Sequence, residues 1–93
     1  MKTESIINPP KSKVLKSGRV ILLPGESVGK HTTKKREELI IVLNGIATIV
    51  KNKERFHLKA GEINYIKENV PHNIINNSNQ KLEYIYIVGL FNQ

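Results

Sequence analysis

The chain has 93 residues, enough for one domain, and it contains no cysteine, so disulfides and thiolate metal ligands are excluded. Lys and Arg (15) outnumber Asp and Glu (8), and the formal net charge of +7 favours anionic partners. No apolar run approaches the roughly 18 residues of a membrane span, and the N-terminal segment lacks the apolar core of a signal peptide, so we expect a cytoplasmic protein that does not bind membranes.

The basic residues are scattered along the chain, and their densest run is Lys34-Lys35-Arg36. Such scattering is typical of a solvated surface. The sequence has no helix-turn-helix pattern, no paired Cys/His finger spacing and no aromatic-rich basic strand, so we do not expect nucleic-acid binding through a dedicated motif. A small molecule, anionic in view of the charge, is the expected partner. Salt-dependent binding of nucleic acid to the basic surface is the weaker alternative.

In chain order, residues 1–13 are predicted to form an N-terminal arm, because Pro9 and Pro10 are incompatible with a helix or a central strand. Residues 14–93 are predicted to form a single domain, with regular structure starting near Val14. Short runs rich in Ile, Val, Thr and Tyr follow, separated by Gly, Pro and Asn, which is typical of a sandwich or closed barrel. The predicted strands are Arg19–Leu23, Val28–Thr33, Glu38–Leu43, Ile46–Val50, Arg55–Lys59, Glu62–Ile66, His72–Asn76 and Leu82–Val88.

No segment of a dozen residues carries apolar positions at helical spacing, so we expect no helix. The run Ile40-Ile41-Val42 followed by Asn44-Gly45 is best explained as a strand entering a tight turn, because Asn-Gly is the strongest two-residue hairpin signal. We therefore predict that Glu38–Leu43 and Ile46–Val50 pair with each other as an antiparallel hairpin.

Two predicted strands are apolar on both faces, since alternate residues on each side of Leu39–Leu43 and of Leu82–Val88 are apolar. A strand of a small sandwich has only one face in the core. A chain this short has little sequence left for a second covering layer. The surplus apolar face therefore predicts a homodimer interface.

The stretch from Gly25 to Gly45 resembles the first motif of the cupin superfamily. In that motif a glycine is followed, after five residues, by His-x-His, then after three or four residues by a glutamate, and after six more by a glycine. Gly25, His31, Glu38 and Gly45 fall in this register. Thr33 stands in place of the second histidine.

A second stretch resembles the second cupin motif, which runs glycine, five residues, Pro-x-Gly, two residues, histidine, three residues, asparagine. Gly61, His72 and Asn76 match this pattern. Lys67 replaces the proline and Asn69 replaces the glycine of the turn. After glycine, asparagine is the residue that best tolerates the positive φ of such a turn.

The resemblance implies a small single-domain cupin, an all-β double-stranded β-helix (jelly-roll barrel) of about eight antiparallel strands. It also implies a pocket in which His31, Glu38 and His72 hold a divalent metal, with Thr33 at the position of the missing fourth ligand. Independently of the family, alternation in a barrel can turn side chains from separate strands toward one another. Two imidazoles and a carboxylate suit Fe(II), Mn(II), Ni(II), Zn(II) or Cu(II), without selecting one of them.

Each of these residues also has a structural interpretation. His31 could end a strand, and His72 could hydrogen-bond within the turn after Pro71. Thr33 supplies only a neutral hydroxyl, so the pocket either leaves a coordination position open for water and substrate or has lost its metal. Glu37 breaks the spacing to the motif glycine and is expected to point outward.

Other polar and aromatic residues are assigned by position. His57 alternates with basic residues and is expected on the surface. Tyr65, Tyr84 and Tyr86 are expected to line the pocket or the interface. Asn76 is expected to steady a loop or to orient a ligand histidine.

Two functions are compatible with these features. The first is a metal-dependent enzyme acting on a small polar or anionic molecule, attracted by a basic rim that contains Lys30, Lys34 or Lys35. The second is a non-catalytic ligand-binding or sensor module with a metal-free pocket, which the presence of Thr33 favours. Because cupins share one barrel across many activities, the sequence predicts neither the substrate nor the reaction.

Overall fold

The computed structural model of the chain describes residues 1–91, which contain nine strands and no helix. The strands are β1 (Lys2–Ile7), β2 (Leu15–Leu22), β3 (His31–Thr32), β4 (Arg36–Asn44), β5 (Ile46–Lys51), β6 (Glu54–Lys59), β7 (Ile63–Ile66), β8 (Pro71–Ile75) and β9 (Leu82–Leu90). Within this described part of the chain, no helix could cross a membrane.

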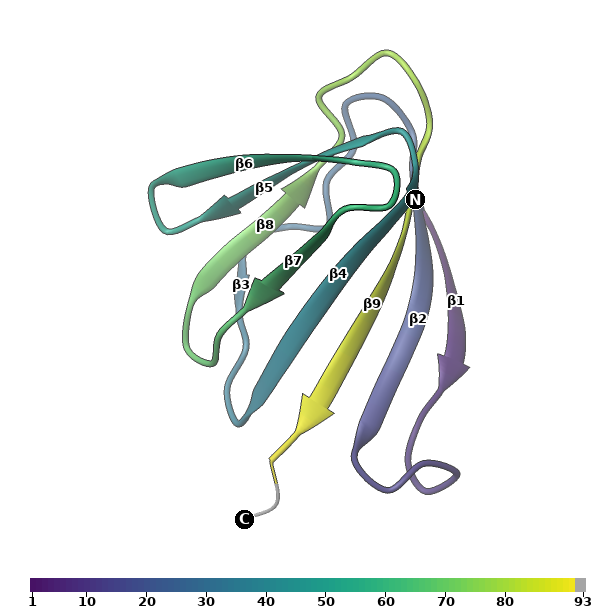
Figure 1. Ribbon diagram of the computed structural model, residues 1–93, viewed down its shortest axis with the longest axis vertical. Helices are drawn as coiled ribbons and strands as arrows, with labels where there is room; N and C mark the ends of the chain where they lie inside the picture. Colours follow the sequence, from purple (N-terminus) through teal and green to yellow (C-terminus); the bar gives the residue numbers. More distant parts are fainter. Residues whose placement is uncertain (92–93) are drawn as a thin grey trace.

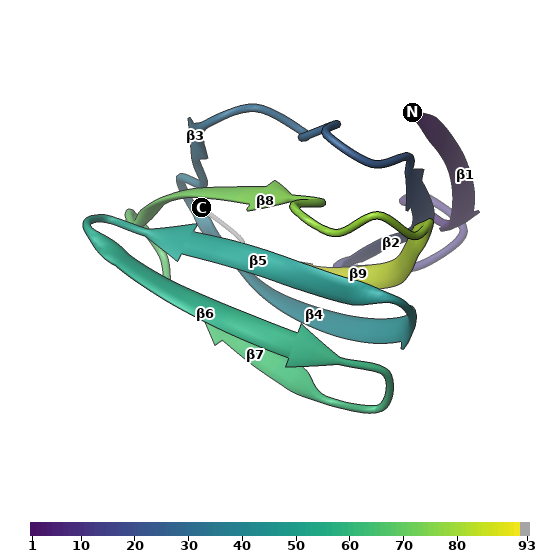
Figure 2. The same cartoon turned by 90° about the horizontal axis from the view of Figure 1, so that it is seen from above.

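The strands form two antiparallel sheets, as the all-β prediction requires. The five-stranded sheet has the order β1-β2-β9-β4-β7, and the four-stranded sheet has the order β3-β8-β5-β6 (Figure 1). Seen from above, β5 and β8 lie over β9 and β4 (Figure 2), with the apolar core between the sheets. The buried core side chains are Val20, Leu22, Ile40, Val42, Ala47, Ile49, Leu58, Ile66, Ile74, Leu82 and Tyr84.

The predicted hairpin between Glu38–Leu43 and Ile46–Val50 is wrong. β4 pairs with β9 along one edge and with β7 along the other, so no edge is left for β5. β5 pairs with β6 and β8 in the opposite sheet. Gly45 makes this crossing possible, because its φ is 86° and a Cβ at this position would collide with the backbone of Lys81.

Regular structure begins earlier than Val14, so that expectation is also wrong. Lys2–Ile7 forms the edge strand β1, which pairs with β2 through a register that begins at Lys2 and Ile21. Pro9 and Pro10 follow the strand and lie in the turn that leads to β2. The two prolines therefore lie outside β1 and do not interrupt its hydrogen bonds to β2.

The other predicted strands are found with shifted ends. β2 begins at Leu15 instead of Arg19, and the segment predicted as Val28–Thr33 contains only the two-residue strand β3. Before β3, residues of this segment bond to the edge of β8 through single contacts, such as the amide of Val28 donating to the carbonyl of Ile74. With β1 added, residues 1–91 form nine strands instead of about eight.

Candidate metal centre

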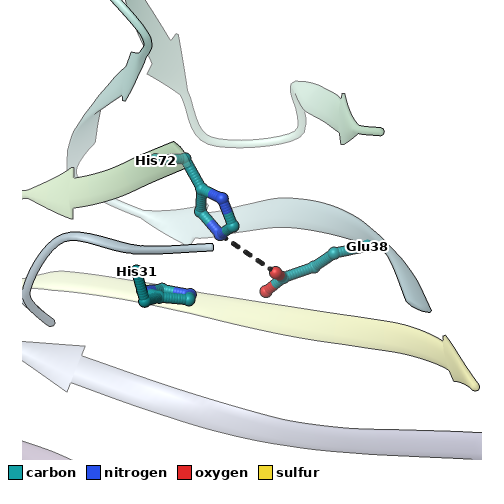
Figure 3. Close-up of side chains that lie close together, drawn as sticks. All are labelled: His31, Glu38 and His72. Carbon is teal, nitrogen blue, oxygen red and sulfur yellow. Dashed lines mark ion pairs between the residues drawn. The ribbon is translucent and has the colours of Figure 1, made fainter. Parts of the chain in front are cut away.

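The two histidines of the motifs meet across a strand pair. His31 in β3 is the direct antiparallel partner of His72 in β8. Their ring centroids lie 4.2 Å apart with an interplanar angle of 64°, an edge-to-face arrangement (Figure 3). His72 is 1% exposed, whereas His31 lies at the exposed end of the pair.

Both imidazoles are held in the same way by the backbone. Nδ1 of His31 lies 2.9 Å from the carbonyl oxygen of Gly29, and Nδ1 of His72 lies 2.8 Å from that of Val70. A carbonyl can only accept a hydrogen bond, so each Nδ1 carries the proton and donates. In the neutral ring, each Nε2 then keeps a free lone pair. This is the tautomer and anchoring that metal-binding histidines require.

Glu38 approaches the histidines from the facing sheet. It lies on the inner face of β4, is 8% exposed, and its Oε1 lies 3.4 Å from Nε2 of His72 (Figure 3). This is an ion-pair distance, but the two atoms are not aligned for a hydrogen bond, so the buried Nε2 has no hydrogen-bond partner among residues 1–91. A buried polar nitrogen without a partner is rare and indicates a missing ligand or ion.

The three side chains each offer one donor atom, and these atoms lie within 4.8 Å of one another. Two ligands of one ion with bonds of about 2.1 Å are separated by roughly 3 to 4 Å. Only a small contraction of the group would therefore bring all three atoms onto one ion. Two neutral imidazoles and a carboxylate form a donor set that fits a first-row divalent metal.

The environment of His72 also affects its proton. Burial of the imidazole acts to lower the pKa of His72, but the Glu38 carboxylate and the Val70 carbonyl outweigh it and hold this pKa above its ordinary value of 6.5. The contact with Glu38 thus stabilises the protonated ring relative to an imidazole in water. A proton and a metal ion would compete for the same Nε2.

The site opens into a cavity of about 460 Å³ between the sheets, lined by His31 and Glu38 among others. Three basic side chains, Lys16, Lys34 and Arg36, line the same cavity. Within the part of the chain that the structure describes, none of the three forms an ion pair with a carboxylate. The cavity therefore brings three basic side chains beside two of the three candidate ligands, His31 and Glu38, whereas His72 lines a second, smaller pocket.

Comparison with known proteins identifies the fold family. Residues 18–88 match the family model described as "Cupin domain", which covers most of the chain. The chain belongs to the cupin family. No curated protein gives a significant sequence match.

Solved structures show the same fold. A predicted oxalate decarboxylase from Thermotoga maritima superposes with a TM-score of 0.88 at 25% identity, covering 96% of this chain and 79% of its own. The Cupin_2 domain of an XRE-family transcriptional regulator from Enterobacter cloacae has a TM-score of 0.88 at 15% identity, covering 98% and 97%. A sugar phosphate isomerase of the cupin superfamily from Silicibacter pomeroyi has a TM-score of 0.76 at 15% identity, covering 83% and 51%.

The basic residues of this cupin are placed partly as the sequence suggested. Lys34 lines the cavity, whereas Lys30 lines a smaller pocket and Lys35 occupies the turn before β4 with a φ of 59°. Lys16 and Arg36 were not predicted. Arg36 could have been found, because it lies two residues before Glu38 on one strand and therefore faces the same side.

Lys16 reaches the cavity through pairing that no local pattern reveals. In the five-stranded sheet, Lys16 of β2 and Glu38 of β4 are both register partners of Val88 in the intervening β9. The three residues thus form one row on the inner face. Because the row depends on two non-local strand pairings, strand alternation alone does not predict it.

Thr33 lies where the cupin motif would place a histidine, and it is buried in the cavity wall with His31 and Glu38. Its carbonyl accepts a hydrogen bond from the amide of Asn69 at 2.8 Å. Asn69 has a φ of 67°, as expected for the residue in place of the motif glycine. Thr33 therefore offers the cavity a hydroxyl and ties the motif-1 loop to the motif-2 turn.

The three tyrosines divide between the two faces of the sheet. Tyr84 and Tyr86 line the cavity, and burial raises the pKa of Tyr84, so its phenol stays protonated. Tyr65 is exposed on the outer face, where its hydroxyl donates to Oε1 of Glu37 at 2.8 Å. The outward orientation predicted for Glu37 is confirmed by this contact.

Asn76 and His57 also have structural roles. The Asn76 side chain is fully buried and donates to the carbonyls of Leu22 and Gln80, while its Oδ1 accepts from Ser78. It steadies the loop that precedes β9, one of its two predicted roles. His57 is exposed on β6, as predicted, with Nδ1 3.2 Å from the hydroxyl of Thr48.

Proposed function

We propose that this cupin binds a divalent metal through His31, Glu38 and His72 and that its cavity binds or transforms a small anionic molecule beside the metal. The observation that carries the proposal is the anchoring of both Nδ1 atoms by backbone carbonyls. In the neutral rings, this anchoring leaves the Nε2 lone pairs free near a buried carboxylate. Without a metal, the buried Nε2 of His72 has no hydrogen-bond partner among residues 1–91.

The donor set is compatible with Fe(II), Mn(II), Ni(II), Zn(II) or Cu(II). When bound, such an ion would supply a Lewis acid that polarises an oxygen of the ligand or activates oxygen or water. Three protein ligands would leave coordination positions of such an ion free for a small molecule. The Thr33 hydroxyl, in the cavity wall, can hydrogen-bond a ligand there.

The cations of the cavity support an anionic ligand. Arg36 is two residues from Glu38 on the same face of β4, so their Cα atoms are separated by roughly 7 Å. A ligand of a few heavy atoms could therefore place one oxygen at the metal group and a second anionic group at Arg36. The guanidinium suits a carboxylate or phosphate because it can donate two parallel hydrogen bonds. Oxalate, named in the description of the Thermotoga maritima protein, is an anion of this class.

The metal part is tested on the full chain after removal of bound metal with a chelator. We expect one equivalent of Mn(II), Ni(II) or Zn(II) to bind by titration calorimetry, and His72→Ala to weaken binding by at least about tenfold. His57→Ala is the matched control, because His57 lies on the outer surface and should leave binding unchanged. Equal affinity of wild type and His72→Ala would contradict the proposal.

The anion part is tested with oxalate, malonate and phosphate as probes, added to metal-loaded protein. We expect Arg36→Gln to weaken binding of at least one probe by about tenfold or more. Lys53→Gln removes the same charge from an exposed turn outside the cavity and should change little. A similar small loss in both variants would indicate general charge attraction without a defined anion site.

A metal-free binding module is the second candidate, and Thr33 in place of a motif histidine favours it. The fold-level match to the domain of an XRE-family transcriptional regulator, a protein described as a regulator, is compatible with such a role. In that case the probes bind equally well with chelator present, and binding still depends on Arg36. Loss of probe binding on metal removal would exclude this alternative.

A further inference from the structure

The outer face of the four-stranded sheet carries a second pocket, separate from the cavity between the sheets. It has a volume of about 200 Å³ and is lined, among others, by Lys30, Val50, Asn52, Arg55, Asn73 and Ile75. Arg55 of β6 pairs with Val50 of β5, which pairs with Asn73 of β8, and these strands lie side by side in Figure 1. Ile49 and Ile74 are buried in the core, so their chain neighbours Val50 and Asn73 face away from it.

Two basic side chains lie at the ends of this row. Arg55 is at one end, and Lys30, which directly precedes β3, is at the other; both are exposed. Within residues 1–91, neither side chain forms an ion pair with a carboxylate. The outward positions of β5, β6 and β8 contain no Asp or Glu, because Glu54 is on the same side of β6 as Phe56, which packs against the core. The pocket is therefore positively charged.

An amide between the two cations is held in a fixed orientation. The backbone N–H of Gly29 donates to Oδ1 of Asn73 at 3.0 Å. A backbone N–H cannot accept a hydrogen bond, so the amide oxygen of Asn73 faces Gly29 and its NH2 group is turned away from it. Asn73 is half-buried in the pocket wall. Its NH2 group is thus the part of the side chain that is left to donate to a ligand.

These groups suit an anion whose oxygens point in several directions. Lys30 and Arg55 lie three strand spacings apart, or roughly 14 Å between Cα atoms, so their long side chains can meet over the middle of the row. The guanidinium donates two parallel hydrogen bonds, and the ammonium acts as a point charge. Donors therefore approach from both ends of the pocket and from Asn73 between them. A carboxylate has only two oxygens to meet them, whereas a phosphate group has at least three.

We propose that this pocket binds a phosphate group, either free or at the end of a small phosphomonoester, through Arg55, Lys30 and the amide of Asn73. Its volume of about 200 Å³ is below the roughly 300 Å³ at which pockets for drug-sized ligands begin, so it accommodates a phosphate group and little more. None of the three donor groups is a candidate metal ligand or lines the cavity. The site is therefore independent of the proposed function.

The test is titration of the isotope-labelled full chain with inorganic phosphate, followed by NMR in the presence of chelator. We expect saturable shifts of the Asn73 side-chain amide and of the Gly29 backbone amide, which sodium chloride at equal ionic strength does not produce. Arg55→Gln should weaken phosphate binding by at least about tenfold, because it removes the bidentate donor. Lys59→Gln is the matched control: Lys59 is exposed on the same side of β6 but does not line the pocket, and its loss should change the affinity less than about twofold.

A second variant tests the amide. Asn73→Asp keeps an oxygen that can accept from Gly29, but it replaces the NH2 donor by a negative charge, so phosphate binding should be lost while the rest of the spectrum is retained. Undiminished binding to Asn73→Asp would overturn the proposal, and so would equal weakening in Arg55→Gln and Lys59→Gln. Shifts that disappear in Arg36→Gln and persist in Arg55→Gln would place the phosphate in the cavity and would also overturn it.

The same titration with glycerol phosphate distinguishes the two sources of the group. Tighter binding of the ester than of inorganic phosphate would support a phosphomonoester as the ligand, whereas equal or weaker binding would support free phosphate. In both cases the affinity should depend on Arg55. Binding of the ester that does not change in Arg55→Gln would contradict the assigned site.

Discussion

The two faces of the five-stranded sheet differ in a way that separates function from packing. The inner face carries an acidic group and two cations in the cavity, Glu38, Lys16 and Arg36, although inner faces of sandwiches are normally apolar. The outer face carries apolar and aromatic side chains over its centre, such as Leu39, Ile41 and Ile63, although outer faces are normally polar. On β4, the charged Glu38 faces inward and the apolar Leu39 next to it faces outward, which reverses the usual distribution of polar and apolar side chains. A charge placed inside a sheet sandwich has a desolvation cost, which is tolerated where the group serves a site.

The largest difference between the two faces is expected when neighbouring residues of β4 are truncated. Ile40 is fully buried on the inner face, whereas Ile41 is half-buried on the outer face beside Ile85. Ile40→Ala should lower the free energy of unfolding by about 2 to 5 kcal/mol, because it leaves a cavity in the core. Ile41→Ala should cost about 1 kcal/mol in the monomer.

Urea unfolding measures both variants, at a protein concentration where sedimentation finds monomers. The matched pair controls for strand propensity, since the two changes are chemically identical. Equal losses would mean that the outer face is as well packed as the core within a single chain.

A smaller effect is expected from two glycines that face opposite sides of the sheet. A Cβ on Gly18, which faces inward, would lie 2.6 Å from the hydroxyl oxygen of Tyr86 and 2.8 Å from the carbonyl oxygen of Glu4. A Cβ on Gly89, on the outer face, would meet its closest neighbour, Cγ of Glu37, at 3.7 Å. Gly18→Ala should therefore destabilise the fold by about 1 to 3 kcal/mol, while Gly89→Ala should change stability little.

Thermal or urea unfolding compares the two alanine variants. Adding Tyr86→Ala to Gly18→Ala should recover part of the loss if the Tyr86 ring is the obstacle. No recovery would assign the strain to the contact between β1 and β2 instead.

The smallest expected effect is the pH dependence of the metal-free protein. The pKa of His72 is raised in the folded state, so its contribution to stability is fully present below the unfolded pKa of about 6.5. That contribution is lost as the pH rises through the folded pKa. We expect the stability difference between wild type and His72→Gln, measured in chelator, to shrink from pH 6 toward pH 8. A difference that grows over this range would contradict the Glu38 contact as the cause.

Much of the candidate site could be predicted from the sequence. Motif spacing pointed to His31, Glu38 and His72, and the structure brings their donor atoms within 4.8 Å of one another. The spacing was informative because each residue belongs to a short strand or turn whose register is set locally, as Asn69 illustrates with its positive φ. The carbonyl anchors of the two imidazoles were not predicted, because they depend on backbone geometry two residues before each histidine.

The all-β class, the absence of helix in residues 1–91 and the surplus apolar face could be predicted from the sequence, because a period of two is a local property of each strand. The pairing of the strands, by contrast, depends on contacts between distant segments of the chain. β5 does not pair with β4, because both edges of β4 are occupied by β7 and β9. Lys16 and Glu38 lie in one row because both pair with Val88. These pairings join residues far apart in the chain, and their free energy comes from packing of two whole sheets, which no local pattern encodes.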